Sequence, residues 1–499
     1  MRKVLATLAL ATVPAIALSA CNGPSNGASG VSALPNTTVG HAKLRPNDFS
    51  SNDLHAGGAT FPAYGYNLGS EPAGLATKPQ APPGTGSIFA SIKLGANATI
   101  YYCLTGSGTG RGIFETGSKG QSDGSTATTT GACGPLGATP SGFGARVDPP
   151  DFAGTDVAMA STEYPTYKTT REPSTGTNWG EPFEFPVIGG PIIYAYRPQD
   201  FKKFGAPLHL SRWTYCAMAN GTVSNWNDAA ITADNGGKSV TNGASRPVTF
   251  YFRSDGSGTG FNFTSHLTLA CNAAFKKPYN AAPYESSGHS AKWSYGVSQN
   301  WPGPGSLAVP NSHFVGESGN PGVLAAVQSS PYSTGYLEGA WAKSANPAVA
   351  QAWLGNGKKS GGKFVFVDPT VAANTNASFA NVSAASIQRG MGSDGIPLGS
   401  SRPDCQLYLD PAVWNGPIVR GKAGRDAYPI MAASYLLFYG NNNNFHIVSK
   451  KKIIAFMAGG KAAKIWANLE YTPLSKAILT AAKDAALKDP GDGKGPCVK

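Results

Sequence analysis

The pentapeptide Gly-Ser-Gly-Thr-Gly occurs twice in this chain, at Gly106–Gly110 and at Gly256–Gly260. Each copy follows an apolar run typical of a strand and precedes a segment able to start a helix. Glycine lets backbone N–H groups face outward, and serine and threonine add hydroxyl donors, so each copy is suited to hold an anion. Two such loops suggest two jaws closing on one oxyanion, while a pair of flexible Gly/Ser loops explains the composition equally well.

The residues around the second copy favour an anion site. Arg253 would supply a fixed fork of donors for a tetrahedral oxyanion, and Asp255 would orient its guanidinium. In the first turn of the following helix, free N–H groups and the helix dipole favour negative charge by roughly 0.3–1 kcal/mol. That turn would contain Ser257, Gly258 and Thr259. The absent lysine excludes a P-loop, and the glycine spacing is not that of a dinucleotide fingerprint.

The N-terminus predicts export. A short basic start, Met1-Arg2-Lys3, precedes the apolar run Val4–Leu18 and then Leu18-Ser19-Ala20-Cys21. The last four residues resemble the bacterial lipobox, whose cysteine is lipidated; the alternative is an ordinary signal peptide with a coincidental cysteine. We therefore expect a signal peptide over 1–20, lipidation at Cys21, a flexible tether over 21–52 and a periplasmic or cell-surface lipoprotein in the bacterial cell envelope.

The seven cysteines agree with an oxidising compartment. Six remain after Cys21, and although many pairings are possible we favour sequential ones. These are Cys103–Cys133, Cys216–Cys271 and Cys405–Cys497. No CxxC or paired-histidine spacing occurs, so no metal site and no cofactor are expected.

Length, composition and charge limit the class of protein. At 499 residues, with 63 glycines and 38 prolines, the chain predicts at least two domains and long loops. The formal net charge of +12 favours anionic partners, but the lysines are scattered in short groups without interleaved aromatics, so no nucleic-acid partner is expected.

Alternating strand-like and helix-like segments indicate an α/β fold. Residues 115–148 and 355–427 have the composition of insertions. Strands are predicted over Phe185–Tyr196, Pro247–Phe252, Lys363–Val367 and Tyr428–Tyr439, and helices over Gly260–Ala270, Lys451–Ala467 and Pro473–Leu487.

These motifs together resemble the phosphate-binding proteins that serve bacterial phosphate-specific ABC importers. The segment Arg253–Thr259 is similar to that family's Arg-x-Asp-Gly-Ser-Gly-Thr motif, and nine other landmarks follow the family's order. They include Gly57–Pro62, Gly106–Gly108, Asp151–Asp156, Pro186–Gly190, Ser224–Asp228, Gly319–Val323, Gly335–Glu338, Tyr428–Ile430 and Tyr471–Leu474.

The resemblance implies a two-lobed periplasmic binding protein of type II, the Venus-flytrap fold, with the ligand cleft between the lobes. Lobe I would comprise 53–190 and 429–499, and lobe II 191–428 with the loop-rich insertion 355–427. The implied phosphate ligands are Thr60, Phe61, Ser107, Asp156, Arg253, Ser257, Gly258 and Thr259, with Asp255 orienting Arg253.

Asp156 is the implied selectivity gate. A carboxylate beside an anion repels it unless the ligand carries a proton to donate, and phosphate at neutral pH does so while sulfate does not. Charge-assisted hydrogen bonds contribute roughly 1.5–3 kcal/mol each. The alternative is that Asp156 only caps a turn.

Some residues depart from the family pattern. Cys103-Leu104-Thr105 replaces the Gln-Gly expected before the second loop, and Val157-Ala158-Met159 replaces a small-Pro sequence after the gate. Docking to a permease is therefore less secure than anion binding.

The expected function is high-affinity binding of inorganic phosphate in the envelope and its delivery to an ABC permease. A monomer held to the membrane by lipid alone would do this by hinge closure, without catalysis. Two alternatives stay open: a phosphatase or serine hydrolase using Ser107 or Ser257, and a surface or adhesive protein that retains the anion site.

Overall fold

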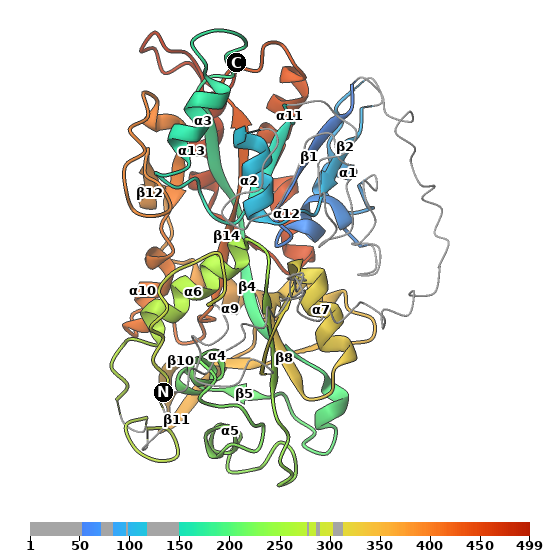
Figure 1. Ribbon diagram of the computed structural model, residues 1–499, viewed down its shortest axis with the longest axis vertical. Coiled ribbons are helices and arrows are strands. Elements are labelled where there is room, and N and C mark those ends of the chain that lie inside the picture. Colours follow the sequence, from blue (N-terminus) through green and yellow to red (C-terminus); the bar gives the residue numbers. More distant parts are fainter. Residues whose placement is uncertain are drawn as a thin grey trace, which may run out of the picture. The chain divides into compact units, whose positions relative to one another are not determined.

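The long strand β4 (Pro182–Tyr196) runs through both sheets of the fold and changes its partner midway. From Pro182 to Pro191 it pairs antiparallel with β14 (Met431–Tyr439), and from Ile192 onward with β8 (Ser333–Glu338). Every residue of β4 is buried, as the predicted apolar strand requires, and the strand begins earlier than expected. Figure 1 shows β4 passing from one group of elements into the other.

The structure is a computed structural model that describes residues 52–70, 83–95, 98–116, 149–276, 279–285, 290–302 and 313–499. These residues belong to one compact unit, His41–Lys499. The predicted signal peptide, Cys21, Cys133 and residues 117–148 of the first predicted insertion lie outside the described residues. Of the helices that are described, none combines the length and the apolar character needed to cross a bilayer.

The first sheet has the strand order β2-β1-β3-β14-β4. This sheet and the helices packed on it are called lobe I. β1 (Leu54–Gly58), β2 (Ile100–Cys103) and β3 (Phe152–Thr155) are parallel to one another and buried throughout, as is typical of α/β sheets. Its helices are η2 (Tyr64–Leu68), α1 (Ile88–Ser91), α2 (Ser107–Thr116), α3 (Tyr164–Arg171), α11 (Ile447–Met457), α12 (Gly460–Asn468) and α13 (Lys476–Leu487).

Two predicted helices at the end of the chain differ from the structure. The helix expected over Lys451–Ala467 is divided into α11 and α12, because Gly459 adopts an extended conformation at the start of α12. The helix expected from Pro473 begins only at Lys476, since β15 (Thr472–Pro473) pairs with β4 instead.

The second sheet, lobe II, has the order β4-β8-β6-β7. β6 (Thr249–Arg253) lies parallel to both β7 (Phe314–Glu317) and β8, and β9 (Ala350–Gln351) pairs with the end of β4. A disulfide between Cys216 and Cys271 joins α4 to the end of α6. The helices are η4 (Pro198–Phe201), α4 (Arg212–Ala219), α5 (Ala229–Asp234), α6 (Gly258–Ala270), α7 (Gly319–Ser329) and α8 (Gly339–Lys343).

The segment 355–427 passes between the two lobes. It begins in lobe II, in a small sheet of β5 (His209–Leu210), β10 (Trp353–Ser360) and β11 (Lys363–Val367). After α9 (Ala372–Ser378), the residues 387–409, which we call the strap, contact β4 and α13 of lobe I through β13 and the short helix η7. The chain then returns to lobe II, where α10 contacts α6. The remaining elements are η6 (Ala384–Ser386), β12 (Ile387–Arg389), η7 (Pro403–Cys405), β13 (Leu407–Leu409) and α10 (Ala412–Val419).

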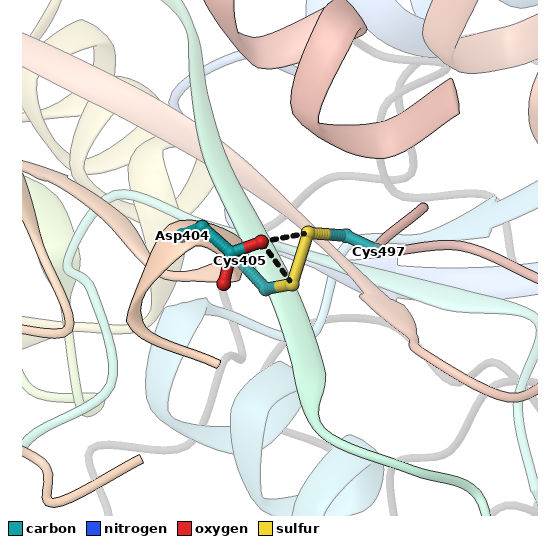
Figure 2. A group of neighbouring side chains, drawn as sticks. All are labelled: Asp404, Cys405 and Cys497. Atoms are coloured by element: carbon teal, nitrogen blue, oxygen red, sulfur yellow. Dashed lines mark hydrogen bonds between the residues drawn. A yellow bond between two sulfur atoms is a disulfide. The ribbon is translucent and has the colours of Figure 1, made fainter. Parts of the chain in front are cut away.

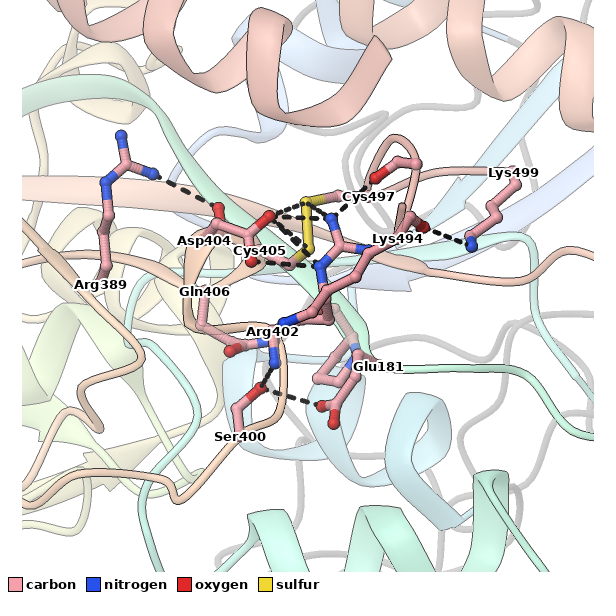
Figure 3. The surroundings of a disulfide bond; sticks show 12 residues. Glu181, Arg389, Ser400, Arg402, Asp404, Cys405, Gln406, Lys494, Cys497 and Lys499 are labelled. Atoms are coloured by element: carbon pink, nitrogen blue, oxygen red, sulfur yellow. Dashed lines mark hydrogen bonds and ion pairs between the residues drawn. A yellow bond between two sulfur atoms is a disulfide. The ribbon is translucent and has the colours of Figure 1, made fainter. Parts of the chain in front are cut away.

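Polar contacts and a disulfide hold the strap to lobe I. The Ser161 hydroxyl donates to Asp394 (2.5 Å), and Cys405 is joined to Cys497 near the end of the chain. Around that disulfide, Arg402 donates to the carbonyl oxygens of Lys494 and Gly495 (Figure 3). The strap therefore contacts lobe I, which the assignment of all of 355–427 to lobe II did not predict.

The carboxylate beside this disulfide does not form a metal site. Ligand atoms of Asp404, Cys405 and Cys497 lie within 4.8 Å of one another (Figure 2). Both sulfur atoms, however, are bonded to each other, and the Asp404 carboxylate accepts from the guanidinium of Arg402 at 2.8 Å. The cluster therefore anchors the end of the chain rather than offering free ligands.

The segment 355–427 also fills the crossover between the lobes. A Cβ added to Gly189 would lie 2.0 Å from the ring of Phe379, so only glycine leaves room for that ring. Phe379 contacts Trp414 edge-on, and the Trp414 indole donates to the carbonyl oxygen of Met431 in β14 (3.1 Å).

Candidate functional site

Four strands end at the place where the predicted anion ligands gather. β1, β2 and β3 of lobe I lead into Thr60, Ser107 and Asp156, and β6 of lobe II ends at Arg253. Carboxyl ends of parallel strands meet at the same edge of a sheet, where α/β proteins place their ligands. A backbone hydrogen bond from Gly108 to the carbonyl oxygen of Gly256 (2.8 Å) joins the loops of the two lobes.

The first Gly-Ser-Gly-Thr-Gly copy makes the turn from β2 into α2. Gly106 has φ +85°, and a Cβ there would lie 2.6 Å from the carboxylate of Asp255 in lobe II. Ser107, the first residue of α2, donates to Asp156 Oδ2 (3.2 Å) and accepts from the Asp156 backbone N–H (3.1 Å). The first loop therefore brings Ser107 to the site, and its Gly106 allows the loop to pack closely against Asp255 of lobe II.

The second copy caps α6. The Ser257 hydroxyl oxygen accepts from the backbone N–H of Gly260 (2.9 Å), which satisfies one of the free donors of the first turn. A Cβ on Gly258 would lie 2.6 Å from Ser107 Oγ and 2.7 Å from Asp156 Cβ. The two pentapeptides thus lie in contact across the lobes, as the two-jaw hypothesis expected.

Arg253 is buried and held by several partners. Its Nε donates to Asp255 Oδ1 (2.6 Å) and its Nη2 to Asp255 Oδ2, so Asp255 holds the guanidinium through a bidentate pair. Nη1 donates to Thr259 Oγ1 (3.3 Å) and to Asn320 Oδ1 (3.1 Å). Burial lowers the pKa of Arg253, but the neighbouring charges, above all Asp255, outweigh burial and the pKa is raised. The guanidinium is therefore a permanent charge with a fixed orientation.

Asp156 lies on the lobe I side of the site and is 2% exposed. Burial raises its pKa to about 7, against the lowering effects of the Ser434 hydroxyl, the Arg253 charge and the hydroxyls of Ser107 and Thr259. Its carbonyl oxygen accepts from the Asn262 side chain on α6 (2.7 Å), so the residue is also tied to lobe II. Near neutral pH the carboxyl group is poised between its charged and protonated forms.

The hydroxyl groups of the site are oriented by donors from the protein. Thr60 Oγ1 accepts from the Asn320 backbone N–H (3.2 Å), and Thr259 Oγ1 accepts from Arg253. Ser257 Oγ accepts within the first turn of α6. A hydroxyl whose oxygen already accepts from an N–H keeps its proton for another acceptor. These three hydroxyls therefore keep their protons for another acceptor, and for Thr259 the Asp156 carboxylate is one such acceptor.

Two buried polar atoms at this site have no hydrogen-bond partner among the described residues. One is an acceptor, Asp156 Oδ1, which no hydrogen bond of ordinary length reaches, and the other is a donor, Asn320 Nδ2. Buried polar groups are nearly always paired, so unpaired ones at one site indicate a missing partner. A ligand able both to donate and to accept would satisfy both atoms.

Thr60 and Phe61 follow the end of β1, in the loop that was expected to supply backbone donors. Phe61 is fully buried, and its carbonyl oxygen accepts from the Tyr471 hydroxyl (2.8 Å), while the carbonyl oxygen of Thr60 accepts from the Trp341 indole (2.9 Å). Trp341 belongs to α8 of lobe II, so this loop also contacts both lobes.

The sequence-based site omitted Asn320. Its segment, Gly319–Val323, was recognised as a family landmark but given no role. Asn320 lies at the start of α7, and the preceding Gly319 N–H donates to Asp255 Oδ1 (2.9 Å). The sequence Gly-Asn-Pro-Gly indicated a turn, but only the three-dimensional contact with Arg253 identifies the Asn320 side chain as part of the site.

Residues 93–458 match the family model described as the PBP superfamily domain. The chain belongs to the PBP superfamily. It is 29% identical over 287 residues to phosphate-binding protein PstS 2 of Mycobacterium tuberculosis, covering 57% of this chain and 59% of that protein. It is 28% identical to phosphate-binding protein PstS of Methanocaldococcus jannaschii, covering 54% and 57%. The matches thus span less than two thirds of these relatives' length.

Solved structures show the same fold. A phosphate-binding protein from Stenotrophomonas maltophilia aligns with TM-score 0.54 and 18% identity, covering 87% of this chain and 94% of that one. The periplasmic phosphate-binding protein PfluDING, solved with phosphate bound, aligns with TM-score 0.55 and 18% identity, covering 88% and 95%. The α/β two-lobed fold expected from the sequence is therefore confirmed.

Proposed function

We propose that this protein binds inorganic phosphate between its lobes and delivers it to an ABC importer without catalysis. One observation carries the proposal: Asp156 Oδ1, a buried acceptor without a partner among the described residues, belongs to the same site as Arg253 and as hydroxyl groups whose oxygens already accept from N–H groups. A monoprotonated tetrahedral oxyanion has the matching pattern, with several acceptor oxygens and one O–H donor. The names of the similar proteins, phosphate-binding proteins, support the same ligand.

We assign the ligand contacts to the residues expected from the sequence. Backbone N–H groups and hydroxyls at helix starts would surround the anion, and the Arg253 guanidinium would neutralise its charge. The proposed ligands are Thr60, Phe61, Ser107, Asp156, Arg253, Ser257, Gly258 and Thr259, with Asp255 orienting Arg253.

Selectivity would follow from Asp156. A phosphate O–H can donate to the carboxylate, whereas sulfate offers no proton and leaves two negative oxygens facing each other. A site whose buried polar group is left unpaired can reject an analogue by about 10⁴–10⁵.

Release of the anion would occur by hinge opening. We place the hinge where β4 changes its partner, at Pro191 and Ile192. The proposed lobes are 53–190 with 429–499, and 191–428 without the strap, which contacts lobe I. Opening would break the Gly108–Gly256 bond between the two loops.

A hydrolase is the competing function, and the site gives it little support. Ser257 is engaged as the cap of α6, and the Ser107 hydroxyl both donates to Asp156 and accepts from its backbone N–H. The histidine on α6, His266, contacts Tyr215 and Asn415 instead.

The proposal includes an envelope location with a lipid anchor at Cys21, the permease partner and a monomeric state. Incorporation of labelled fatty acid by the expressed precursor, and its loss in Cys21→Ala, would test the anchor.

Calorimetry on the purified protein tests the ligand directly. We expect tight binding of phosphate and of arsenate, which also carries a proton, and much weaker binding of sulfate. Equal affinities for phosphate and sulfate would refute the role of Asp156, and absence of any phosphate binding would refute the function.

A further inference from the structure

Asn320 is a fully buried residue whose polar groups are only partly engaged. Its backbone N–H donates to Thr60 Oγ1 in lobe I, and its Oδ1 accepts from Arg253 Nη1 in lobe II. The side-chain amide nitrogen, Nδ2, has no partner among the described residues. Asn320 thus lies between two proposed phosphate ligands of opposite lobes with one donor unused.

Chemistry fixes the orientation of this amide. The guanidinium of Arg253 can only donate, so the atom of Asn320 that faces it must be the oxygen. The NH₂ group therefore points away from that bond and cannot exchange places with the oxygen without losing it. The unpaired donor is a property of the site and not of an amide assignment.

We propose that Asn320 Nδ2 donates a hydrogen bond directly to the bound anion. This inference rests on the proposed phosphate binding and adds a ligand at the start of α7 to those at β1, α2 and α6. Through its N–H bond to Thr60, Asn320 also turns the Thr60 hydroxyl proton toward the ligand. Asn320, a residue of lobe II, therefore orients ligands of both lobes.

The rival interpretation is that Asn320 only holds Arg253 in place and that its Nδ2 donates to a water molecule instead of to the anion. The two interpretations differ in what loss of the NH₂ group does. Arg253 is already held by a bidentate pair with Asp255, so losing one more acceptor should leave its position unchanged. Loss of a charge-assisted donor to the anion should instead weaken phosphate binding by about 10- to 150-fold.

The chain offers a matched control in Asn415. This residue is also fully buried, its Oδ1 contacts His266 Nδ1 (3.1 Å), and its Nδ2 likewise has no partner among the described residues. Asn415 lies on α10, and its partner His266 lies beyond the first turn of α6, which holds the proposed ligands of that helix. Asn415→Leu therefore carries the general cost of losing a buried asparagine without changing the anion site.

The experiment compares phosphate affinity, by calorimetry, of the wild type, Asn320→Leu, Asn320→Ala and Asn415→Leu, each checked for cooperative thermal unfolding. We expect the Asn320 variants to lose about 10- to 150-fold and Asn415→Leu to bind as the wild type does. If the wild type binds phosphate and the Asn320 variants bind it with the same affinity, this inference is overturned but the proposed function is not. If the wild type does not bind phosphate, the proposed function itself is overturned.

A crystal structure of the wild type with phosphate provides the second measurement and needs no variant. We expect a phosphate oxygen within about 3.2 Å of Asn320 Nδ2. A water molecule at that position, with the anion out of hydrogen-bond reach, would overturn the inference even if the variants bind weakly.

Discussion

Sulfate binding should depend on pH through Asp156. With a pKa of about 7, this carboxyl group is mostly protonated at about pH 6 and mostly ionised at about pH 8. Only the protonated form can donate to an oxygen of sulfate, which has no exchangeable proton in this range. We therefore expect the sulfate affinity of the wild type to rise about tenfold as the pH is lowered from about 8 to about 6.

The assay is calorimetric titration with sulfate across that range, in a buffer without competing oxyanions. Asp156→Asn should bind sulfate with an affinity that no longer depends on pH, because the neutral amide replaces the titrating group. At about pH 8 this variant should bind sulfate at least about tenfold more tightly than the wild type does.

Asp234→Asn is the matched control for this experiment. Asp234 is also buried, and burial raises its pKa to about 7, but it lies in lobe II with Ser211 and Tyr284 as partners. This variant should keep the wild-type pH dependence. A wild-type sulfate affinity that is flat with pH, or a pH dependence that Asp234→Asn abolishes, would refute the assignment of the titrating group to Asp156.

Three further predictions concern stability. Replacing both Cys405 and Cys497 by serine should lower the free energy of unfolding by about 2–5 kcal/mol, since the bridge spans 92 residues; an unchanged melting temperature would contradict this. Gly189→Ala should destabilise by about 1–3 kcal/mol, because its Cβ would overlap the Phe379 ring, and adding Phe379→Leu should restore part of the loss in a double-mutant cycle. Asp151→Asn should cost about 3–5 kcal/mol in denaturant unfolding at neutral pH, because it removes the carboxylate charge beside the buried ammonium group of Lys450, and a loss under 1 kcal/mol would disprove that this ion pair stabilises the fold.

Asp151 also makes the free energy of unfolding of the wild type depend on pH in the acid range. Its lysine and histidine partners overcome burial and hold the pKa of Asp151 below the ordinary value of 3.8. A carboxyl group with a depressed folded-state pKa stabilises the fold above its unfolded pKa. That contribution is lost as the pH falls from about 4 through the folded value.

The segment from Arg253 to Thr259 shows what local spacing can predict. Asp255 lies two residues from Arg253, and the Ser257 cap lies three residues before the N–H that it binds. Contacts of this kind depend on the strand end and the first helical turn, both of which the sequence pattern indicates. The contact of Asp255 with Arg253 and the place of Ser257 at the start of α6 were therefore predictable from the sequence.

Other features depend on residues far apart in the chain. Ser107 and Asp156 are 49 residues apart, and the resemblance to a known family, not their spacing, predicted that they meet. Asn320 is 67 residues from Arg253 and 260 from Thr60, so no local pattern indicated its role. The path of the strap was missed for the same reason, since its composition indicates loops but not the lobe they contact.

The sequence by itself determined the kinds of groups available for an anion and the local turns that present them. Tertiary structure decided which of those groups are buried together and how their protons are directed. The pKa of Asp156 is the clearest case, because an aspartate in water would be charged at neutral pH and burial alone raises it toward 7. Burial and hydroxyl orientation result from packing between lobes, and packing joins residues that the sequence keeps hundreds of positions apart.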